Sequence, residues 1–159
     1  MIDGLLSGLI LLSALGCGLI AGVFFAFSAF VMKALARLPS AQGMAAMQSI
    51  NVAVFNPLFM GAFFGTAAAC ALLAVAALFL WPRPDAGYLL AGSVLYLVGT
   101  VLVTMVFNVP RNQALAAVEP ESADGVIRWA GYVPGWTAWN HVRSVAALLA
   151  AASFALALR

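Results

Sequence analysis

The stretch GWTAWNHVR at residues 135–143, followed by the charge-free run 144–158, decides how often this chain can cross a membrane. A spanning helix needs about 20 apolar residues. The run 144–158 has only 15 residues, so it can cross only if its helix begins earlier and includes the polar residues that precede it. We therefore expect a helix over 135–157, restarted by Pro134 and Gly135.

The rest of the chain supplies three longer apolar runs, 4–32, 38–82 and 86–110, which contain no Asp, Glu, Lys or Arg. Hydrophobic residues make up 65% of the 159 residues and charged residues 8%, whereas about a quarter of an ordinary soluble domain is charged. This composition excludes a water-soluble globule. Strands of alternating polarity are absent, so the spans must be helices, which satisfy their own backbone hydrogen bonds in lipid.

We predict an all-α integral membrane protein, a single domain over residues 1–159 that forms an up-down four-helix bundle. Asn56 caps the second span and Pro57 opens it, and Pro110 closes the third span. Short interfacial helices are expected in the first loop, over 41–54, and in the third loop, where 123–130 is amphipathic. The expected spans are 5–32, 57–81, 86–109 and 135–157.

Lys and Arg gather beside the first and third loops, which the positive-inside rule places in the cytoplasm, with both termini outside. The first apolar run is too long for a signal peptide, so we expect a retained span in a bacterial inner or plasma membrane. The net charge of +2 is too small to suggest a nucleic-acid partner, and the apolar runs predict the lipid bilayer as the partner. The basic residues on the loop side are Lys33, Arg37, Arg111, Arg128 and Arg143, and those on the other side are Arg83 and Arg159.

Polar side chains lie where spans one and three end and where spans two and four begin, which is one face of the membrane in an up-down bundle. This clustering predicts a polar pocket near the cytoplasmic surface. Its candidate residues are Ser28, Lys33, Asn51, Asn56, Asn108, Arg111, Asn112, Asn140, His141 and Arg143.

In the fourth span, Trp136, Trp139, Asn140 and Arg143 have the spacing of one helix face, and His141 points away from it. Either face can line the pocket. The structural alternative is that the Trp residues form an aromatic belt, that Arg143 snorkels and that the Asn residues cap helix ends.

The sequence offers few residues for a metal, haem or thiol site. One histidine, no acid within a span and no CxxC pair leave too few ligands for a structural zinc or di-metal site, so no metal is expected; a haem with His141 as axial ligand is an alternative. Cys17 and Cys70 are expected to be buried thiols. The patterns Gly18–Gly22 and Gly61–Gly65 favour close helix packing within the chain, with a homo-oligomer as the alternative.

Several motifs resemble the anthrone oxygenase-like family of small membrane proteins. They are GVFFAFS (22–28), VMKAL (31–35), Met47 with Gln48, NPLF (56–59), NVPRN (108–112) with Leu115, and WTAWNHVR (136–143). The resemblance covers nearly the whole chain. It implies a four-helix membrane fold and, as in characterised fungal members, oxidation of an anthrone to an anthraquinone by dioxygen without metal or flavin.

This resemblance implies a small hydrophobic aromatic substrate and a site with three tasks. His141 would act as the base, Arg143, Asn140 and Asn112 would stabilise the developing oxyanion, and aromatic side chains would hold the flat ring. Those aromatic residues are Phe27, Trp136 and Trp139, with Asn56 and Asn108 as further substrate contacts. The alternative function is a non-catalytic protein that binds a small hydrophobic molecule or lipid, its polar motifs being structural.

Overall fold

The computed structural model describes the backbone of residues 2–159 and the side chains from residue 4 onward, and this part of the chain is helical without strands. Four stretches are long and apolar enough to cross a membrane: Gly4–Ala36, Pro57–Leu80, Ala86–Ala116 and Ala123–Ala157. The chain is therefore an integral membrane protein with a four-helix core, as the sequence predicts. Its elements are α1 (Ile2–Ala26), η1 (Phe27–Val31), α2 (Met32–Ala36), α3 (Ser40–Ala53), α4 (Pro57–Leu80), α5 (Ala86–Tyr96), η2 (Leu97–Leu102), η3 (Thr104–Asn108), α6 (Val109–Ala116) and α7 (Ala123–Ala157).

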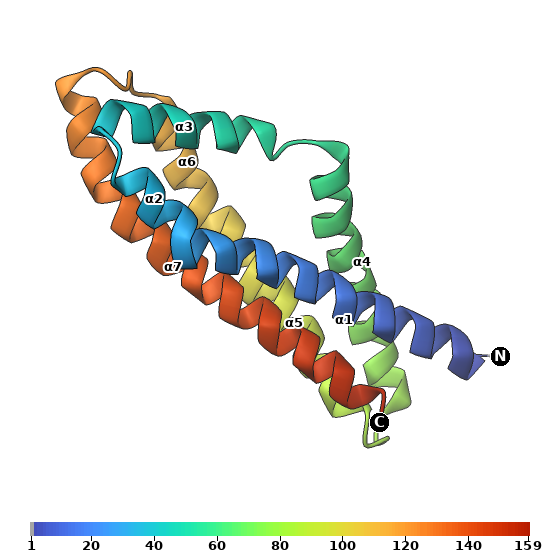
Figure 1. Cartoon of the computed structure of the whole chain (residues 1–159). Coiled ribbons are helices and arrows are strands. Elements are labelled where there is room, and N and C mark those ends of the chain that lie inside the picture. Colours follow the sequence, from blue (N-terminus) through green and yellow to red (C-terminus); the bar gives the residue numbers. More distant parts are fainter. Residues whose placement is uncertain (1) are drawn as a thin grey trace.

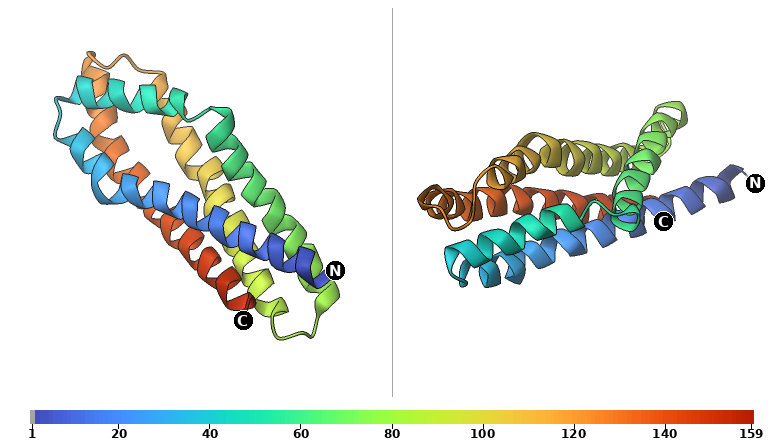
Figure 2. Two further views of the ribbon diagram at one scale, coloured as in Figure 1. Left: turned by 45° about the vertical axis from the view of Figure 1, so that its right-hand side comes forward. Right: turned by 90° about the horizontal axis from the view of Figure 1, so that it is seen from above.

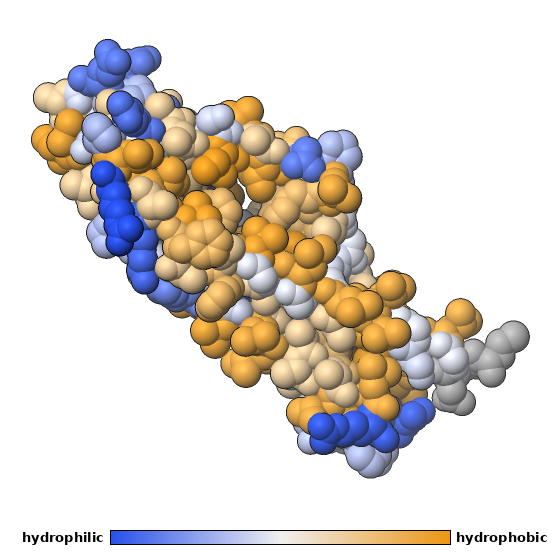
Figure 3. All heavy atoms as spheres, viewed as in Figure 1, coloured by the Kyte–Doolittle hydropathy of each residue, from blue (hydrophilic) through white to orange (hydrophobic). Residues whose placement is uncertain are grey.

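Three of the long helices, α1, α5 and α7, run alongside one another, and α4 is tilted against them (Figures 1 and 2). Both α1 and α5 pack against α7, and α4 packs against α1 and α5. Both termini lie at one end of the bundle, and α3 crosses the other end (Figures 1 and 2). Hydrophilic side chains gather at the two ends of the bundle, and hydrophobic side chains cover much of the face between them (Figure 3). This is the surface expected of a protein solvated by lipid.

The first-loop helix α3 confirms the expected short helix and docks onto the bundle rather than lying free. Its Met44 and Met47 are buried in a cluster with Met32, Leu115 and Trp129. Gln48 donates hydrogen bonds to two backbone oxygens in the third loop region. The two loops on this side therefore form one packed layer.

The fourth helix corrects the sequence prediction, because α7 runs unbroken from Ala123 and contains Pro134 within it. A proline costs the helix one backbone hydrogen bond, but packing on both sides of it can hold the helix straight. Trp129, Tyr132 and Trp136 are all buried in the cluster with α2 and α3. The separate amphipathic helix expected in the third loop is therefore the first part of α7.

The third helix likewise continues through Pro110 to Ala116 rather than ending at residue 109, and the first continues to Ala36. Three segments in these helices are π-helical: η1 in the first helix, and η2 and η3 in the third. Such segments are rare and frequently occur at functional sites.

The glycine patterns do not mark close contacts within the chain. A Cβ at Gly18, Gly22, Gly61 or Gly65 would meet open space, so the expected packing at these patterns is wrong. Close approaches between helices occur instead at Gly16, where a Cβ would collide with Thr66, and at Gly99, where a Cβ would lie 2.5 Å from that of Ala146. The cysteines are as expected, since Cys17 and Cys70 are free and buried in the core.

Candidate functional site: a buried arginine beside an aromatic cavity

Arg143 lies on the inner face of α7, and its side chain is only 4% exposed. Its Nη1 donates to Thr104 Oγ1 at 3.1 Å and its Nη2 donates to Asn140 Oδ1 at 2.7 Å. Its Nε is buried and has no hydrogen-bond partner among the described residues. Because a guanidinium has five N–H donors, Arg143 keeps unused donors inside the protein.

Aromatic rings enclose the same guanidinium. Its central carbon lies 4.1 Å from the centroid of the Phe24 ring and 5.1 Å from that of Trp136. Ring faces attract a cation, and more strongly where water is absent. Snorkelling is therefore not the role of Arg143, because its head group is enclosed within the bundle.

In the part of the chain that the structure describes, no carboxylate neutralises this charge. The ion pair between Arg83 and Asp85 lies in the turn between α4 and α5, whereas Arg143 belongs to the middle part of α7. Glu119, Glu121 and Asp124 belong to the loop before α7 and its first turn. A buried charge without a counter-ion is costly, so it marks a place that an anion would stabilise.

Asn140 holds the arginine in place. It is fully buried, and its amide nitrogen donates to the Phe24 backbone oxygen and to Ser28 Oγ, both at 2.6 Å. Its oxygen accepts from Arg143. The Asn140 side chain therefore joins α7 to the first helix near the beginning of η1 and positions one end of the guanidinium.

Thr104 fixes the other side of the guanidinium. Its hydroxyl donates to the Thr100 backbone oxygen at 2.7 Å within the π-helical part of the third helix, so it accepts from Arg143. Arg143 is thus held by Thr104 of η3 and by Asn140 of its own helix, which is in turn hydrogen-bonded to the first helix.

Arg143 lines a cavity of about 310 Å³ between the first helix, α3, α4 and the third helix. This volume lies at the lower end of the range of small-molecule pockets, about 300–1,000 Å³. Its apolar lining residues are Phe24, Phe27, Phe55, Phe59, Phe63, Phe64, Met47, Met60, Met105, Ile50, Val54 and Val109, and its polar ones are Asn51, Thr104, Asn112 and Arg143.

The cavity has a lipid-facing side. Phe55, Phe64 and Met105 line it, yet they are 71%, 53% and 60% exposed on the outer surface of the helices. A hollow between α3 and the first helix is visible in Figure 3. Part of the cavity wall therefore belongs to the outer surface of the helices.

The structure gathers five of the nine residues named as catalytic or substrate-binding, and Asn51, named for the polar pocket, also lines the cavity. Phe27, Asn112 and Arg143 line the cavity. Trp136 and Asn140 lie behind them, since both contact Arg143 and the Trp136 ring is 5.7 Å from that of Phe27.

His141 is not brought to this cavity. Residues 141 and 143 lie about 160° apart around a helix of 3.6 residues per turn. His141 is exposed, and it lines a separate pocket of about 370 Å³ with Ser28, Met32 and Lys33 among others. The sequence left open which face of the fourth span lines the pocket. In the structure the Arg143 face lines the aromatic cavity, and His141 does not.

The three remaining residues have structural contacts. Asn56 is exposed and caps α4, its side chain accepting from the Phe59 backbone N–H at 2.9 Å. Asn108 is buried and donates to the Trp136 backbone oxygen at 3.2 Å. The ring of Trp139 stacks on that of Phe107, with centroids 3.5 Å apart.

Sequence reasoning missed Phe24, Phe63 and Thr104 as cavity residues. The spacing of Thr104, Asn108 and Asn112 at four-residue intervals was an available signal, because it marks one face of the third helix. Phe24 with Phe27 gave a similar signal on the first helix.

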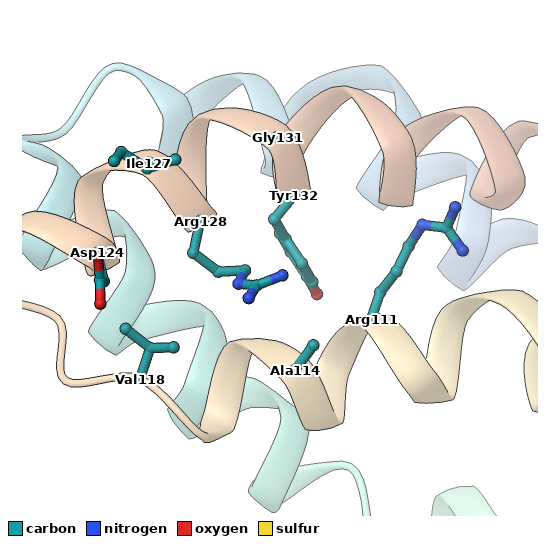
Figure 4. A pocket seen from close by; sticks show the side chains of 8 residues that line it. All are labelled: Arg111, Ala114, Val118, Asp124, Ile127, Arg128, Gly131 and Tyr132. Carbon is teal, nitrogen blue, oxygen red and sulfur yellow. The ribbon is translucent and has the colours of Figure 1, made fainter.

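A second, more polar pocket of about 670 Å³ lies between α6 and α7. Figure 4 shows Arg128 from α7 and Arg111 from α6 on either side of Tyr132. The Tyr132 hydroxyl donates to Asn112 Oδ1 at 2.9 Å, so it links this pocket to the rim of the aromatic cavity.

The donor set does not suggest a metal centre. Across residues 4–159, no three His, Cys, Asp or Glu side chains come together in a group that could hold a metal ion.

Comparison with protein-family models shows the family of this chain. The family model described as anthrone oxygenase matches residues 57–153, about three-fifths of the chain. The matched region begins at the first residue of α4 and includes Thr104, Asn112, Asn140 and Arg143. No curated protein and no solved structure gives a significant match.

Proposed function

Because the chain belongs to the anthrone oxygenase family, we propose that it is a membrane-embedded oxidoreductase that oxidises a flat aromatic or phenolic substrate with dioxygen. The observation that carries this proposal is the buried Arg143 without a carboxylate partner, which faces an aromatic cavity. Aromatic walls suit a planar ring, and the guanidinium suits an oxygen that becomes negatively charged.

The chemistry proposed requires no metal or flavin. An anthrone-type substrate loses a proton from the CH₂ opposite its carbonyl, and the negative charge moves to the carbonyl oxygen. The electron-rich carbon then forms a bond to dioxygen, which is reduced to a hydroperoxide after taking up a proton. Loss of one water molecule leaves the second carbonyl of the product, so one dioxygen is consumed for each substrate.

The roles we assign follow the positions of the side chains. Arg143 binds the oxyanion, and Asn140 and Thr104 hold the guanidinium toward the cavity. Phe24 and Phe27 flank the ring, and Asn112 supplies a second polar contact. We assign His141 no role in the reaction, because it lines another pocket.

We further propose that the protein is a plasma or inner-membrane protein of bacteria, with its termini outside and α3 and the third loop in the cytoplasm. Lys33, Arg37, Arg111 and Arg128 on the α3 side support this orientation by the positive-inside rule. The substrate would then enter from the cytoplasmic leaflet.

The test uses the purified protein in nanodiscs with anthrone and air. Oxygen uptake and anthraquinone absorbance should rise together, and Arg143→Gln should slow the reaction about 10²- to 10³-fold. Arg128→Gln, which removes an arginine outside the cavity, should leave it unchanged. Binding of anthrone without oxygen uptake would favour the non-catalytic binding protein, and a Soret band in the visible spectrum would favour haem.

A further inference from the structure

The groups around Arg143 raise a question about the substrate's proton, because the cavity lacks an ordinary base. The first helix contributes Phe24 and Phe27, and α4 contributes Phe59 and Phe63. None of these side chains titrates. A molecule that must lose a proton in this cavity therefore finds no carboxylate or imidazole among the described lining residues.

The polar lining residues do not change this result. Asn51 from α3, Thr104 from η3 and Asn112 from α6 are neutral amides and a hydroxyl. Beside this lining lies the phenol of Tyr132, whose O–H donates a hydrogen bond to the Asn112 side-chain oxygen. Arg143 is thus the charged group that a ligand meets.

We propose that the cavity binds its ligand as an oxyanion, the phenolate or enolate of a flat aromatic molecule. In place of a protein base that would accept the proton, Arg143 stabilises the ionised ligand. This inference rests on the proposed function for the identity of the ligand. The O–H or C–H bond of the ligand breaks, the electron pair stays on the ligand, and the proton goes to water. The guanidinium makes the ionised form the bound one, because an opposite charge within about 4–6 Å favours ionisation.

A ligand that cannot react separates binding from catalysis. We choose 2-hydroxyanthraquinone, a flat tricyclic phenol that is already oxidised and whose phenolate absorbs at longer wavelength than its neutral form. Its methyl ether, 2-methoxyanthraquinone, has nearly the same shape but cannot ionise. Both are titrated into the protein in nanodiscs made of a zwitterionic lipid.

The wild-type protein should lower the apparent pKa of the bound phenol by about 1 to 3 pH units relative to empty nanodiscs. Above that pKa it should bind the phenol at least about tenfold more tightly than the methyl ether. Arg143→Gln should abolish both effects, Arg143→Lys should retain a large part of them because it keeps the charge, and Arg128→Gln should behave as wild type.

Two results would overturn the inference: wild-type protein that binds the phenol and its ether equally with no change of pKa, or an undiminished effect in a folded Arg143→Gln protein. If that variant does not fold, the wild-type comparison of phenol and ether decides. Anthrone oxidation is measured separately. Ionisation of the probe without anthrone oxidation would refute only the proposed reaction, and oxidation without probe ionisation would refute only this inference.

Discussion

Replacing Asn140 by alanine should destabilise the bundle more than any other single amide truncation at the site. The side chain is fully buried, and the change removes the hydrogen bonds to the Phe24 backbone oxygen, to Ser28 Oγ and from Arg143. It leaves a guanidinium N–H, a carbonyl and a hydroxyl without these partners inside the bundle.

The size of the loss follows from those three bonds. A hydrogen bond between membrane helices contributes about 0.6 kcal/mol on average, and one to a charged group about 1.5–3 kcal/mol. Two neutral bonds and one charged bond therefore give roughly 2.5–4 kcal/mol for Asn140→Ala.

The assay is unfolding of the purified protein in mixed micelles with increasing SDS, followed by tryptophan fluorescence. Asn112→Ala is the matched control, because Asn112 is half-buried and its side chain accepts one hydrogen bond, from the Tyr132 hydroxyl. It should lose about 0.5–1 kcal/mol. A loss for Asn140→Ala no greater than that of the control would show that the amide does not brace α7 against the first helix.

Three more predictions concern the cavity and its surroundings. Phe24→Ala should weaken binding of 2-hydroxyanthraquinone about 5- to 30-fold, because it removes a cavity wall and the ring under the guanidinium; an unchanged dissociation constant in nanodisc titrations would contradict this. His141→Ala should change anthrone oxidation less than twofold, since His141 lines another pocket; a loss of tenfold or more in oxygen uptake would return it to the reaction. Gly43→Val should loosen α3, because even a Cβ there would lie 2.6 Å from the Leu35 backbone oxygen, and faster proteolysis between α2 and α3 is expected, whereas Gly61→Val, in open space, should resist like wild type.

The helical membrane fold could be predicted from the sequence because three of the four charge-free runs are longer than a bilayer requires, and the fourth needs only the residues just before it. The helix ends were harder. Pro134 reads locally as a break, but the buried Trp129 and Trp136 on its two sides hold α7 as one helix. Such packing is long-range, so periodicity within α7 alone does not reveal it.

The site shows the same division. Spacing along the fourth span separates the face of Arg143 from that of His141, and the structure keeps them apart. Which face meets a cavity depends on the position of α4 and α3, whose Phe63 and Met47 form its walls. The prediction of close helix packing at Gly18 and Gly22 was wrong for a related reason, since glycines permit close contact but do not require it.

The lipid-facing walls at Phe55, Phe64 and Met105 determine how any affinity of this protein should be expressed. A ligand that arrives from the acyl chains is in equilibrium with the membrane, so its relevant concentration is its mole fraction in lipid. A strongly partitioning compound will saturate the cavity at a low total amount, and diluting it with more lipid at constant aqueous volume will empty the cavity. Binding constants measured at a single lipid-to-protein ratio will therefore rank ligands partly by their oil–water partition coefficients, and only a lipid titration separates that contribution from recognition by Arg143.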